Sequence, residues 1–217
     1  MPQPNFDLYL VTDRKLTHGR DLLWVLERAL NGGVRAVQLR EKDLSGKELF
    51  GLAERVSRLC QRYQAQLFIN DRVDVALAVD AAGVHLGESS MPVPFARSLL
   101  GAQRIIGVSA HSPEGAGKAE REGADFIVFG PVFFTPSKAA YGAPQGLTAL
   151  RKIVAKISLA VYAIGGIKLE NLPETQKVGS RGVALISAIM SADEPSQAAK
   201  QLLAALREVK PCQKPFN

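Results

Sequence analysis

The sequence predicts an α/β protein with one domain, a closed (β/α)8 TIM barrel over residues 1–217. Short β-rich runs recur along the chain, and helical patterns separate most of them. This alternation favours parallel strands joined by crossover helices. An open doubly wound sheet is the alternative, but it usually holds fewer strands. The eight expected strands are residues 7–12, 35–40, 66–70, 83–86, 104–109, 125–130, 159–166 and 182–189.

The segments between the expected strands carry the apolar stripes of amphipathic helices. Residues 45–63 repeat apolar side chains at helical spacing. A second helix is expected over residues 194–209, with Asp193 as its N-cap. Residues 130–146, rich in Gly and Pro, follow the sixth strand. They are predicted to form a long functional loop and not a domain boundary.

Composition and charge favour a small anionic ligand. The net charge is +6, but Lys and Arg are scattered, apart from a basic tail at about residues 210–217. Nucleic-acid binders usually gather such residues in a patch, so no nucleic-acid partner is expected. No apolar run approaches the roughly 20 residues of a membrane helix, and the N-terminus lacks the order of a signal peptide. We therefore expect a cytoplasmic protein without a membrane partner.

The two cysteines do not suggest redox or metal chemistry. Cys60 and Cys212 are too few and too far apart in the sequence for a disulfide framework or a CxxC motif. Cys60 falls on the apolar stripe of its predicted helix and is expected to be a buried thiol.

An unusual set of polar residues ends the second expected strand. Gln38, Arg40 and Lys42 alternate with period 2, so on an extended strand they share one face. Two cations and an amide make a poor core. Arg40 offers a planar fork for phosphate oxygens and Lys42 a point charge, so this face is predicted to meet an anionic ligand.

Other chemically useful residues follow the remaining strands. The carboxyl ends of the strands form the active site in barrels of this kind. Glycines after the seventh strand and a small polar residue after the eighth are where such barrels often bind phosphate. The candidates after the third to eighth strands are Asn70, Asp71, His85, Glu88, Ser109, His111, Thr135, Ser137, Lys138, Gly165, Gly166, Ile186 and Ser187.

Each candidate also has a structural alternative. Arg40 and Lys42 could be a solvated strand end, Asp71 a helix cap, and Gly165 with Gly166 a tight turn. His85 could be an interior barrel residue. The recurrence of these features at the same end of consecutive strands favours one site for phosphorylated ligands.

Several motifs resemble one enzyme family as a set and in order. They are "LYLVTD", "VQLREK", "FINDRVDVAL", "GVHLG", "GVSAHS", "FGPVFFTPSK", "AIGGI" and "ALISAI". Over about residues 7–195 the chain is similar to thiamine phosphate synthase and to its relative, the TenI-type thiazole tautomerase. The synthase resemblance implies a barrel that joins hydroxymethylpyrimidine diphosphate to hydroxyethylthiazole phosphate and releases pyrophosphate, with Mg²⁺ as cofactor.

The resemblance also assigns roles to residues of this sequence. Arg40, Lys42 and Lys138 are the expected catalytic cations, because they would stabilise the departing pyrophosphate. Asp71 is the expected Mg²⁺ ligand. The pyrimidine diphosphate would be held by Gln38, Arg40, Lys42, Asn70, Ser109 and Lys138. The thiazole phosphate would be held by Thr135, Ser137, Gly165, Gly166, Ile186 and Ser187.

The sequence departs from the synthase pattern at one metal position. Ser90 stands where the family places the second Mg²⁺ carboxylate, and a hydroxyl is a weaker ligand. Glu88 would reach the metal if the segment were extended. A weakened Mg²⁺ site is therefore expected.

That departure keeps two alternatives open. A thiazole tautomerase needs an acid/base group but no magnesium–pyrophosphate site, and His111 would be its catalytic residue. Pro131 of "FGPVF" is the synthase-like residue at a position where the tautomerase has a histidine. The second alternative is a non-catalytic paralogue that binds a precursor or regulates. The sequence leaves a homo-oligomer open.

Overall fold

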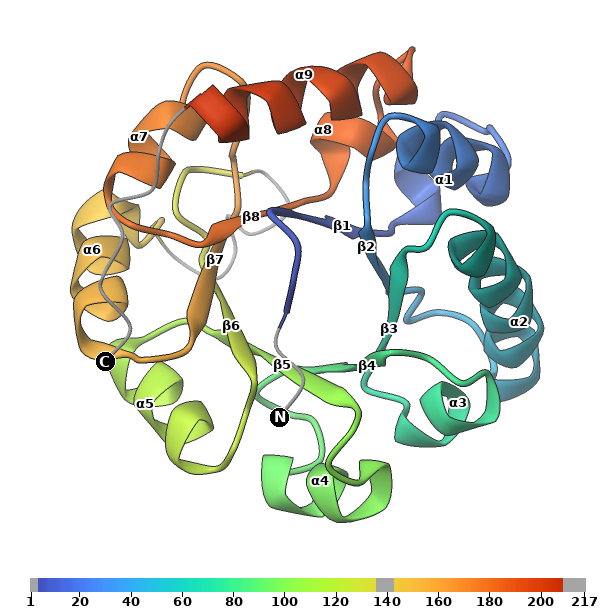
Figure 1. Ribbon diagram of the computed structural model, residues 1–217, viewed down its shortest axis with the longest axis horizontal. Coiled ribbons are helices and arrows are strands. Elements are labelled where there is room, and N and C mark those ends of the chain that lie inside the picture. Colours follow the sequence, from blue (N-terminus) through green and yellow to red (C-terminus); the bar gives the residue numbers. More distant parts are fainter. Residues whose placement is uncertain (1–3, 136–142, 209–217) are drawn as a thin grey trace.

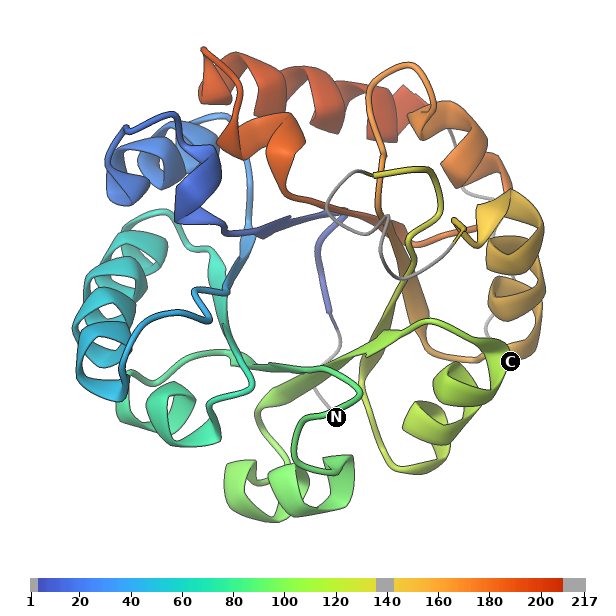
Figure 2. The ribbon, with the colours of Figure 1, turned by 180° about the vertical axis from the view of Figure 1, so that it is seen from behind.

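The computed structural model is a closed barrel of eight parallel strands, β1 to β8 in sequence order, with β8 pairing back onto β1. Figures 1 and 2 show the ring of strands from its two ends, with the helices outside it. The structure describes residues 4–135 and 143–208. The prediction of a single-domain (β/α)8 barrel is confirmed. The extent of the domain beyond the described residues stays a prediction.

All eight expected strands form, but most are shorter than their sequence runs. They are β1 (Leu8–Val11), β2 (Ala36–Leu39), β3 (Gln66–Asn70), β4 (Gly83–Leu86), β5 (Ile105–Ala110), β6 (Phe126–Phe129), β7 (Ala160–Ile164) and β8 (Gly182–Leu185). The run expected at residues 182–189 divides, because β8 ends at Leu185 and a short helix begins at Ser187.

The helices surround the strands. They are η1 (Arg14–Leu16), α1 (Leu22–Asn31), α2 (Gly46–Arg62), α3 (Val73–Ala78), α4 (Val93–Leu100), α5 (Pro113–Arg121), α6 (Gly146–Lys156), α7 (Leu172–Lys177), α8 (Ser187–Met190) and α9 (Pro195–Glu208). α2 begins with a capping box, in which Ser45 and Glu48 each bond the other's backbone N–H. α9 lies along the outside of the barrel beside α1, α7 and α8 (Figure 1).

Alternation along the strands separates two apolar layers. Leu8 and Leu10 of β1 pack outward among the helices, whereas Tyr9 and Val11 point into the barrel. The inside is an aromatic cluster with ring centroids 4.8–5.8 Å apart. Its members are Phe6, Tyr9, Phe68, Phe126 and Tyr162, and we call it the aromatic floor.

The aromatic floor needs one position without a side chain. A Cβ on Gly107 of β5 would lie 2.2 Å from the Phe126 ring, so the glycine makes room for that ring. Tyr162 donates its hydroxyl proton to the carbonyl of Phe6 at 2.8 Å, which joins β7 to the residue before β1. The centre of the barrel is thus a packed core and not a pore.

Two minor expectations concern the cysteines and the membrane. Cys60 is buried on α2, and burial raises the pKa of its thiol to about 12. Cys212 and the basic tail at residues 210–217 lie outside the described residues. Among the described helices, none is long and apolar enough to cross a membrane.

Candidate active site

A polar layer lies next to the aromatic floor, toward the carboxyl ends of the strands. Gln38 of β2 and Ser109 of β5 have the same inward phase as Ala36 and Ile105 of their strands, and the His85 ring of β4 lies 5.7 Å from the Tyr9 ring and 5.8 Å from the Phe126 ring. Gln38 is buried and donates from its amide nitrogen to the Tyr9 hydroxyl at 3.2 Å. This bond leaves the amide oxygen of Gln38 as an acceptor for a ligand.

His85 lies at the centre of this layer. Burial lowers the pKa of its imidazole to about 3, so the ring is neutral near pH 7. Its Nε2 lies 2.9 Å from the Ser109 hydroxyl, while Nδ1 has no hydrogen-bond partner among the described residues. A buried acceptor is left unpaired more often than a buried N–H. The favoured tautomer therefore donates from Nε2 to Ser109, which leaves the Ser109 proton for a ligand.

Two opposite charges act on His85 from neighbouring strand ends. The Asp71 carboxylate, after β3, raises the imidazole pKa, and the Arg40 guanidinium, after β2, lowers it, although both effects are smaller than that of burial. Both charges therefore lie within electrostatic range of the polar layer. The structure brings together Gln38, Arg40, Asn70, Asp71, His85 and Ser109, all predicted from the sequence.

The period-2 interpretation of the second strand holds for two of its three residues. Ala36 and Gln38 point into the barrel, and Arg40 continues their phase. β2 ends at Leu39, however, and Lys42 is an exposed residue of the turn before α2. The chain has to turn there to reach the helix, so Lys42 does not share the strand face.

Asp71 forms a compact hydrogen-bonded unit with its neighbours. The amide of Asn70 donates to its Oδ2 at 2.7 Å, and the Ser90 hydroxyl donates to its Oδ1. The backbone of Asp71 has a φ of 61°, an uncommon conformation that clusters at functional sites. The helix-cap alternative is not supported, because α3 has Arg72 at its N-cap position and no side-chain capping bond.

The residues after β4 bear on the expected metal site. Residues 87–90 form a turn, with the Ser90 N–H donating to the Gly87 carbonyl at 3.2 Å. The segment is therefore not extended, and Glu88 is exposed on the turn. The described residues include no group of three or more His, Cys, Asp or Glu side chains that could hold a metal. Among the residues that the structure describes, Asp71 remains the candidate carboxylate at this strand end, with the Ser90 hydroxyl beside it.

This donor set fits one kind of magnesium site. Mg²⁺ is commonly held by one or two carboxylates together with waters and the phosphates of a substrate. A single carboxylate at a strand end, with hydroxyl and amide neighbours, suits such a shared site. It does not suit a cage built from protein groups alone.

The ends of β6, β7 and β8 are built differently. Gly165 and Gly166 both have positive φ, and a Cβ on either would lie 2.5 Å from the residues after β6, at Pro131 or Phe134. Backbone bonds tie the same segments together: Val132 N–H to the Ile164 carbonyl at 2.8 Å, and Phe133 N–H to the Gly165 carbonyl at 3.0 Å. The glycine pair is thus a tight turn, and it holds the loop after β6 against β7.

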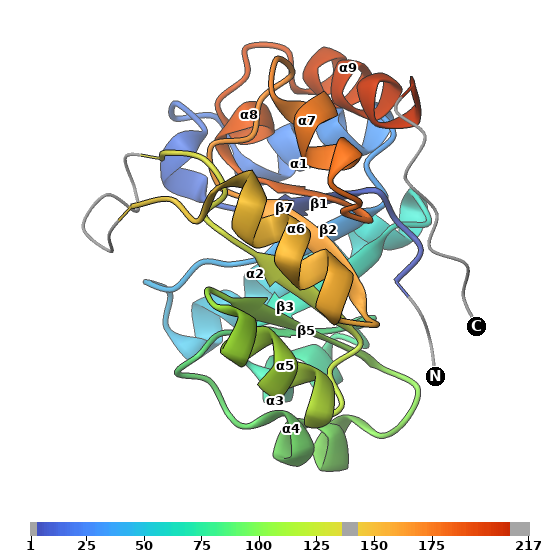
Figure 3. The same cartoon turned by 90° about the vertical axis from the view of Figure 1, so that its left-hand side faces the viewer.

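The remaining predicted residues of this side are only partly described. Thr135 and Ile186 are partly buried, and Ser187 is exposed at the first position of α8. Ser137 and Lys138 lie outside the described residues. The described part of the loop after β6 projects from one end of the barrel in Figure 3, the end at which all eight parallel strands finish.

His111 follows β5 and has a defined tautomer. Its Nδ1 lies within hydrogen-bond distance of the Gly130 carbonyl, which can only accept, so Nδ1 carries the proton. Nε2 is then the basic nitrogen. No second acid or base completes a relay with His111 among the described residues.

Two buried polar residues are not among the candidates that the sequence patterns indicate. Thr12 is fully buried after β1, and the side chain of Glu41 is 3% exposed after β2. Thr12 donates to Glu41 Oε1 at 2.7 Å. One signal in the sequence could have indicated Glu41: it is the single acid in the basic run of residues 40–42. A charged residue that is buried needs partners, so its burial also implies a partner such as Thr12.

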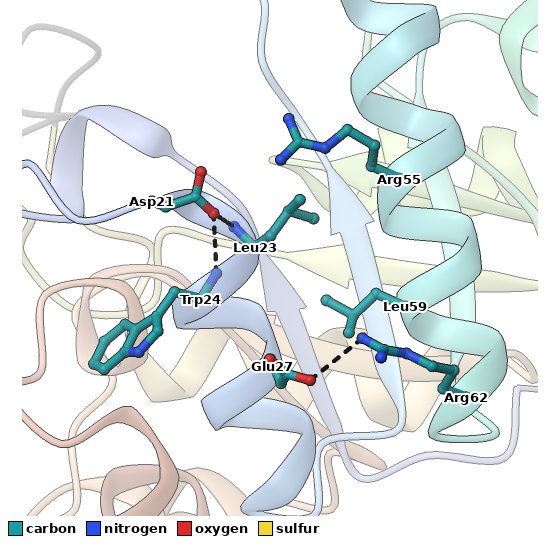
Figure 4. A pocket seen from close by; sticks show the side chains of 7 residues that line it. All are labelled: Asp21, Leu23, Trp24, Glu27, Arg55, Leu59 and Arg62. Carbon is teal, nitrogen blue, oxygen red and sulfur yellow. Dashed lines mark hydrogen bonds and ion pairs between the residues drawn. The ribbon is translucent and has the colours of Figure 1, made fainter.

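The structure also has a surface hollow away from the strand ends. It measures about 320 Å³ and lies between α1 and α2, lined by residues such as Trp24, Arg55 and Arg62 (Figure 4). Glu27 pairs with Arg62 across it at 3.3 Å. None of the predicted site residues lines this hollow, so we do not place the active site there.

The fold and the strand-end residues define a class of protein: a TIM barrel whose carboxyl-end face gathers a cation, a carboxylate, amides and hydroxyls around a buried histidine. The family model described as thiamine monophosphate synthase matches residues 8–189, and the chain belongs to this family. The resemblance in the sequence motifs is thereby confirmed.

Individual relatives agree with the family. A putative thiamine-phosphate synthase of Geobacter sulfurreducens is 55% identical, covering 95% of this chain and 97% of the relative. The thiamine-phosphate synthase of Clostridium novyi is 43% identical over 91% of this chain and 97% of its own. The solved thiamine phosphate pyrophosphorylase of Pyrococcus furiosus is 40% identical with a TM-score of 0.86, over 94% of this chain and 96% of that one. The expected class of enzyme is confirmed.

Proposed function

We propose that this chain condenses hydroxymethylpyrimidine diphosphate with hydroxyethylthiazole phosphate to give thiamine phosphate and pyrophosphate. The observation that carries the proposal is the convergence of Arg40 and Asp71 on the polar layer around His85. A cation for phosphate and a carboxylate for a metal thus lie beside groups that can bind a heterocycle. The names of the relatives support the same reaction.

Gln38 and Ser109 orient the pyrimidine. The amide oxygen of Gln38 accepts a hydrogen bond from the ring's substituents, and the Ser109 hydroxyl, which His85 holds, donates one to a ring nitrogen. Both groups are fixed by buried partners before the ligand arrives, so little orientational freedom remains to be lost on binding. The aromatic floor closes the barrel beneath them and keeps water from the inner face of the ring.

Arg40 stabilises the leaving group. The C–O bond to the diphosphate stretches, positive charge grows on the pyrimidine carbon, and negative charge grows on the departing pyrophosphate. A preformed cation at that place lowers the barrier, because its interaction strengthens as the charge develops. Lys42 and Lys138 are proposed to add point charges on the same anion. No nucleophilic side chain is required.

Asp71, with Ser90 and Asn70 around it, would hold Mg²⁺. The ion, when bound, neutralises pyrophosphate oxygens as they leave. Ser90 stands at the second carboxylate position, so the substrate phosphates would have to supply more of the ligands than beside two carboxylates.

The thiazole phosphate is assigned to the other side of the mouth. Gly165 and Gly166 keep side chains away from the junction of β7 with the loop after β6. Thr135, Ser137, Ile186 and Ser187 are its proposed further contacts. In this position the thiazole nitrogen faces the reacting carbon, and orientation alone contributes a large part of the rate.

The test is a two-substrate assay with purified protein and Mg²⁺. We expect pyrophosphate release that requires both substrates. Arg40→Ala should remove most of it, while Arg55→Ala, a matched change of an arginine far from the strand ends, should not. Calorimetry shows whether the substrates bind. Binding of both without pyrophosphate release above background would contradict the proposal.

A thiazole tautomerase is the second candidate, favoured by one observation. The proton on His111 Nδ1 leaves Nε2 as a base at the end of β5. If this activity were present, His111→Asn would abolish aromatisation of the thiazole carboxylate phosphate. An unchanged rate would reject His111 as its base, and no aromatisation by the wild-type protein would reject the activity.

The remaining expectations belong to this proposal. The partners are phosphorylated pyrimidine and thiazole molecules, and the reaction takes place in the cytoplasm, where such charged metabolites are retained. A homo-oligomer and the absence of a nucleic-acid partner stay predictions, as does the alternative of a non-catalytic paralogue.

A further inference from the structure

Glu41 is a buried carboxylate that stands in the sequence between the partly buried Arg40 and the exposed Lys42. It follows β2 in the outward phase of Val37 and Leu39, while Arg40 has the inward phase. Its side chain is only 3% exposed. A charge in that position is stable only with several partners.

The partners of Glu41 come from the segment after β1. The Thr12 hydroxyl donates to Oε1 at 2.7 Å, and the Arg14 N–H lies 3.2 Å from both carboxylate oxygens. The Arg14 guanidinium adds a bond to Oε2 at 3.3 Å. These contacts join two segments that are 27–29 residues apart in the sequence.

Thr12 links the Glu41 carboxylate to the backbone of Arg40. Its hydroxyl accepts from the Arg40 N–H at 2.9 Å while donating to Glu41. A hydroxyl has one proton, so donation to the carboxylate directs a lone pair at the Arg40 amide. β2 ends at Leu39, so Arg40 lies beyond the paired residues of the strand. Its backbone N–H is held by the Thr12 hydroxyl instead.

The basic residues after β1 form ion pairs, whereas those after β2 form none with the part of the chain that the structure describes. Arg14 pairs with Glu41 and Asp43, and Lys15 pairs with Asp43. The cations after β1 are thus neutralised by the acids after β2. Within residues 4–135 and 143–208, the side chains of Arg40 and Lys42 form no ion pair, so their charges remain for an anion.

We propose that Glu41 and Thr12 are a positioning pair: they lock the backbone of Arg40 so that its guanidinium is aimed at the diphosphate before the substrate binds. The inference rests on the proposed function, because it takes the diphosphate as the ligand of Arg40. Neither residue touches the substrate. Their effect is on the binding of the pyrimidine diphosphate and its leaving group, not on the thiazole phosphate.

The test compares three threonine variants. Thr12→Val removes the hydroxyl at nearly constant shape, Thr12→Ser keeps it, and Thr17→Val removes another buried hydroxyl, which bonds to the carbonyls of Arg14 and Arg20 and not to Arg40. Binding of inorganic pyrophosphate with Mg²⁺ is measured by calorimetry, and KM is measured for each substrate.

We expect Thr12→Val to weaken pyrophosphate binding about tenfold, the effect of losing roughly one hydrogen-bonded constraint. KM for the pyrimidine diphosphate should rise similarly, with KM for the thiazole phosphate unchanged. Thr12→Ser and Thr17→Val should stay within about twofold of the wild type. If Thr12→Val does not fold, Glu41→Gln, which keeps the shape but not the charge, is expected to show the same selective loss.

Two results would overturn the inference alone, given a wild-type protein that turns over. One is Thr12→Val binding pyrophosphate like the wild type. The other is an equal loss for both substrates that Thr12→Ser does not restore, which would mean a general structural role. A wild-type protein that binds both substrates and releases no pyrophosphate would overturn the proposed function, and the inference with it.

Discussion

The two sides of the barrel mouth are built on different principles. From β2 to β5 the inward residues nearest the strand ends are polar and hydrogen-bonded: Gln38 bonds the Tyr9 hydroxyl of the aromatic floor, and His85 bonds Ser109. From β6 to β8 the corresponding residues are Val128, Ile164 and Ile186, all aliphatic. The first side is therefore built from side-chain charge and hydrogen bonds, whereas the second is defined by backbone shape.

Arg40→Ala should have the largest effect, because it removes charge from the polar side. We expect pyrophosphate release to fall by about 10² to 10³, the usual loss when one preorganised group facing developing charge is deleted. Arg40→Lys should recover only part of it, because lysine lacks the bidentate fork. Steady-state kinetics measure both. Equal rates for the lysine variant and the wild type would show that charge alone suffices.

Gly166→Ala tests the shape-based side. The new Cβ would lie 2.5 Å from the Phe134 carbonyl oxygen, in a backbone with a φ of 63°. We expect the free energy of unfolding to fall by about 1–3 kcal/mol and KM for the thiazole phosphate to rise, with pyrophosphate binding unchanged.

Gly123→Ala is the matched control for this substitution. Its φ is 91°, but a Cβ there meets nothing within 4 Å, and Gly123 lies before β6 at the opposite end of the barrel. It should lose stability through backbone strain and keep both KM values. A rise in pyrophosphate Kd with Gly166→Ala would mean that the two sides are not independent.

His85→Gln addresses the pH dependence of the polar side. The folded pKa of His85 is about 3, below its ordinary 6.5, so the unfolded chain binds the extra proton between these values. The neutral imidazole contributes its full stability above pH 6.5, and this contribution is lost as the pH falls toward 3. The slope is at most about 1.4 kcal/mol per pH unit.

Urea unfolding at several pH values between about 3.5 and 7.5 would check this, because that interval covers most of the window between the folded pKa of about 3 and the ordinary pKa of 6.5. The difference in unfolding free energy between wild type and His85→Gln should vary with pH below 6.5 and be constant above it. A difference that does not change with pH would mean that the folded imidazole titrates normally.

Ser90→Asp should give the smallest effect and refine the picture of the metal position. The new carboxylate would adjoin Asp71, and the two like charges should lower the melting temperature in a chelator. Added Mg²⁺ should reverse that loss and reach half-saturation at a severalfold lower concentration than in the wild type. Ser90→Ala is the control, because it removes the hydrogen bond to Asp71 without adding charge. A melting temperature of Ser90→Asp that ignores Mg²⁺ would contradict a metal site at Asp71.

Much of the fold and of the polar side could be predicted from local patterns. Period-2 alternation placed Gln38 and Arg40 correctly, because it follows directly from strand geometry. It failed at Lys42, where the chain leaves the strand to reach α2. Glu41 could not be assigned in this way, because its burial depends on Thr12 and Arg14, which come from a different segment.

The local structure around Asp71 and around the glycine pair could not be predicted from the sequence either, because it depends on contacts with other segments. An aspartate before a helix is as consistent with a cap as with a ligand. Only the bonds from Asn70 and Ser90 show that its carboxylate does not cap α3. In the sequence, Gly165 and Gly166 are as consistent with a tight turn as with a phosphate-binding site. The structure shows that they form a tight turn, packed against the residues after β6.

The aromatic floor has a consequence for synthesis on the ribosome. Phe6 precedes all eight strands in the sequence, yet the hydroxyl that bonds its carbonyl belongs to Tyr162, 156 residues later. Until β7 has been translated, Phe6 and Tyr9 lack the neighbouring Tyr162 ring, so part of their apolar surface stays exposed on the nascent chain. Folding of this barrel is therefore completed late in translation, and the early strands are the part of the chain with most need of protection from aggregation.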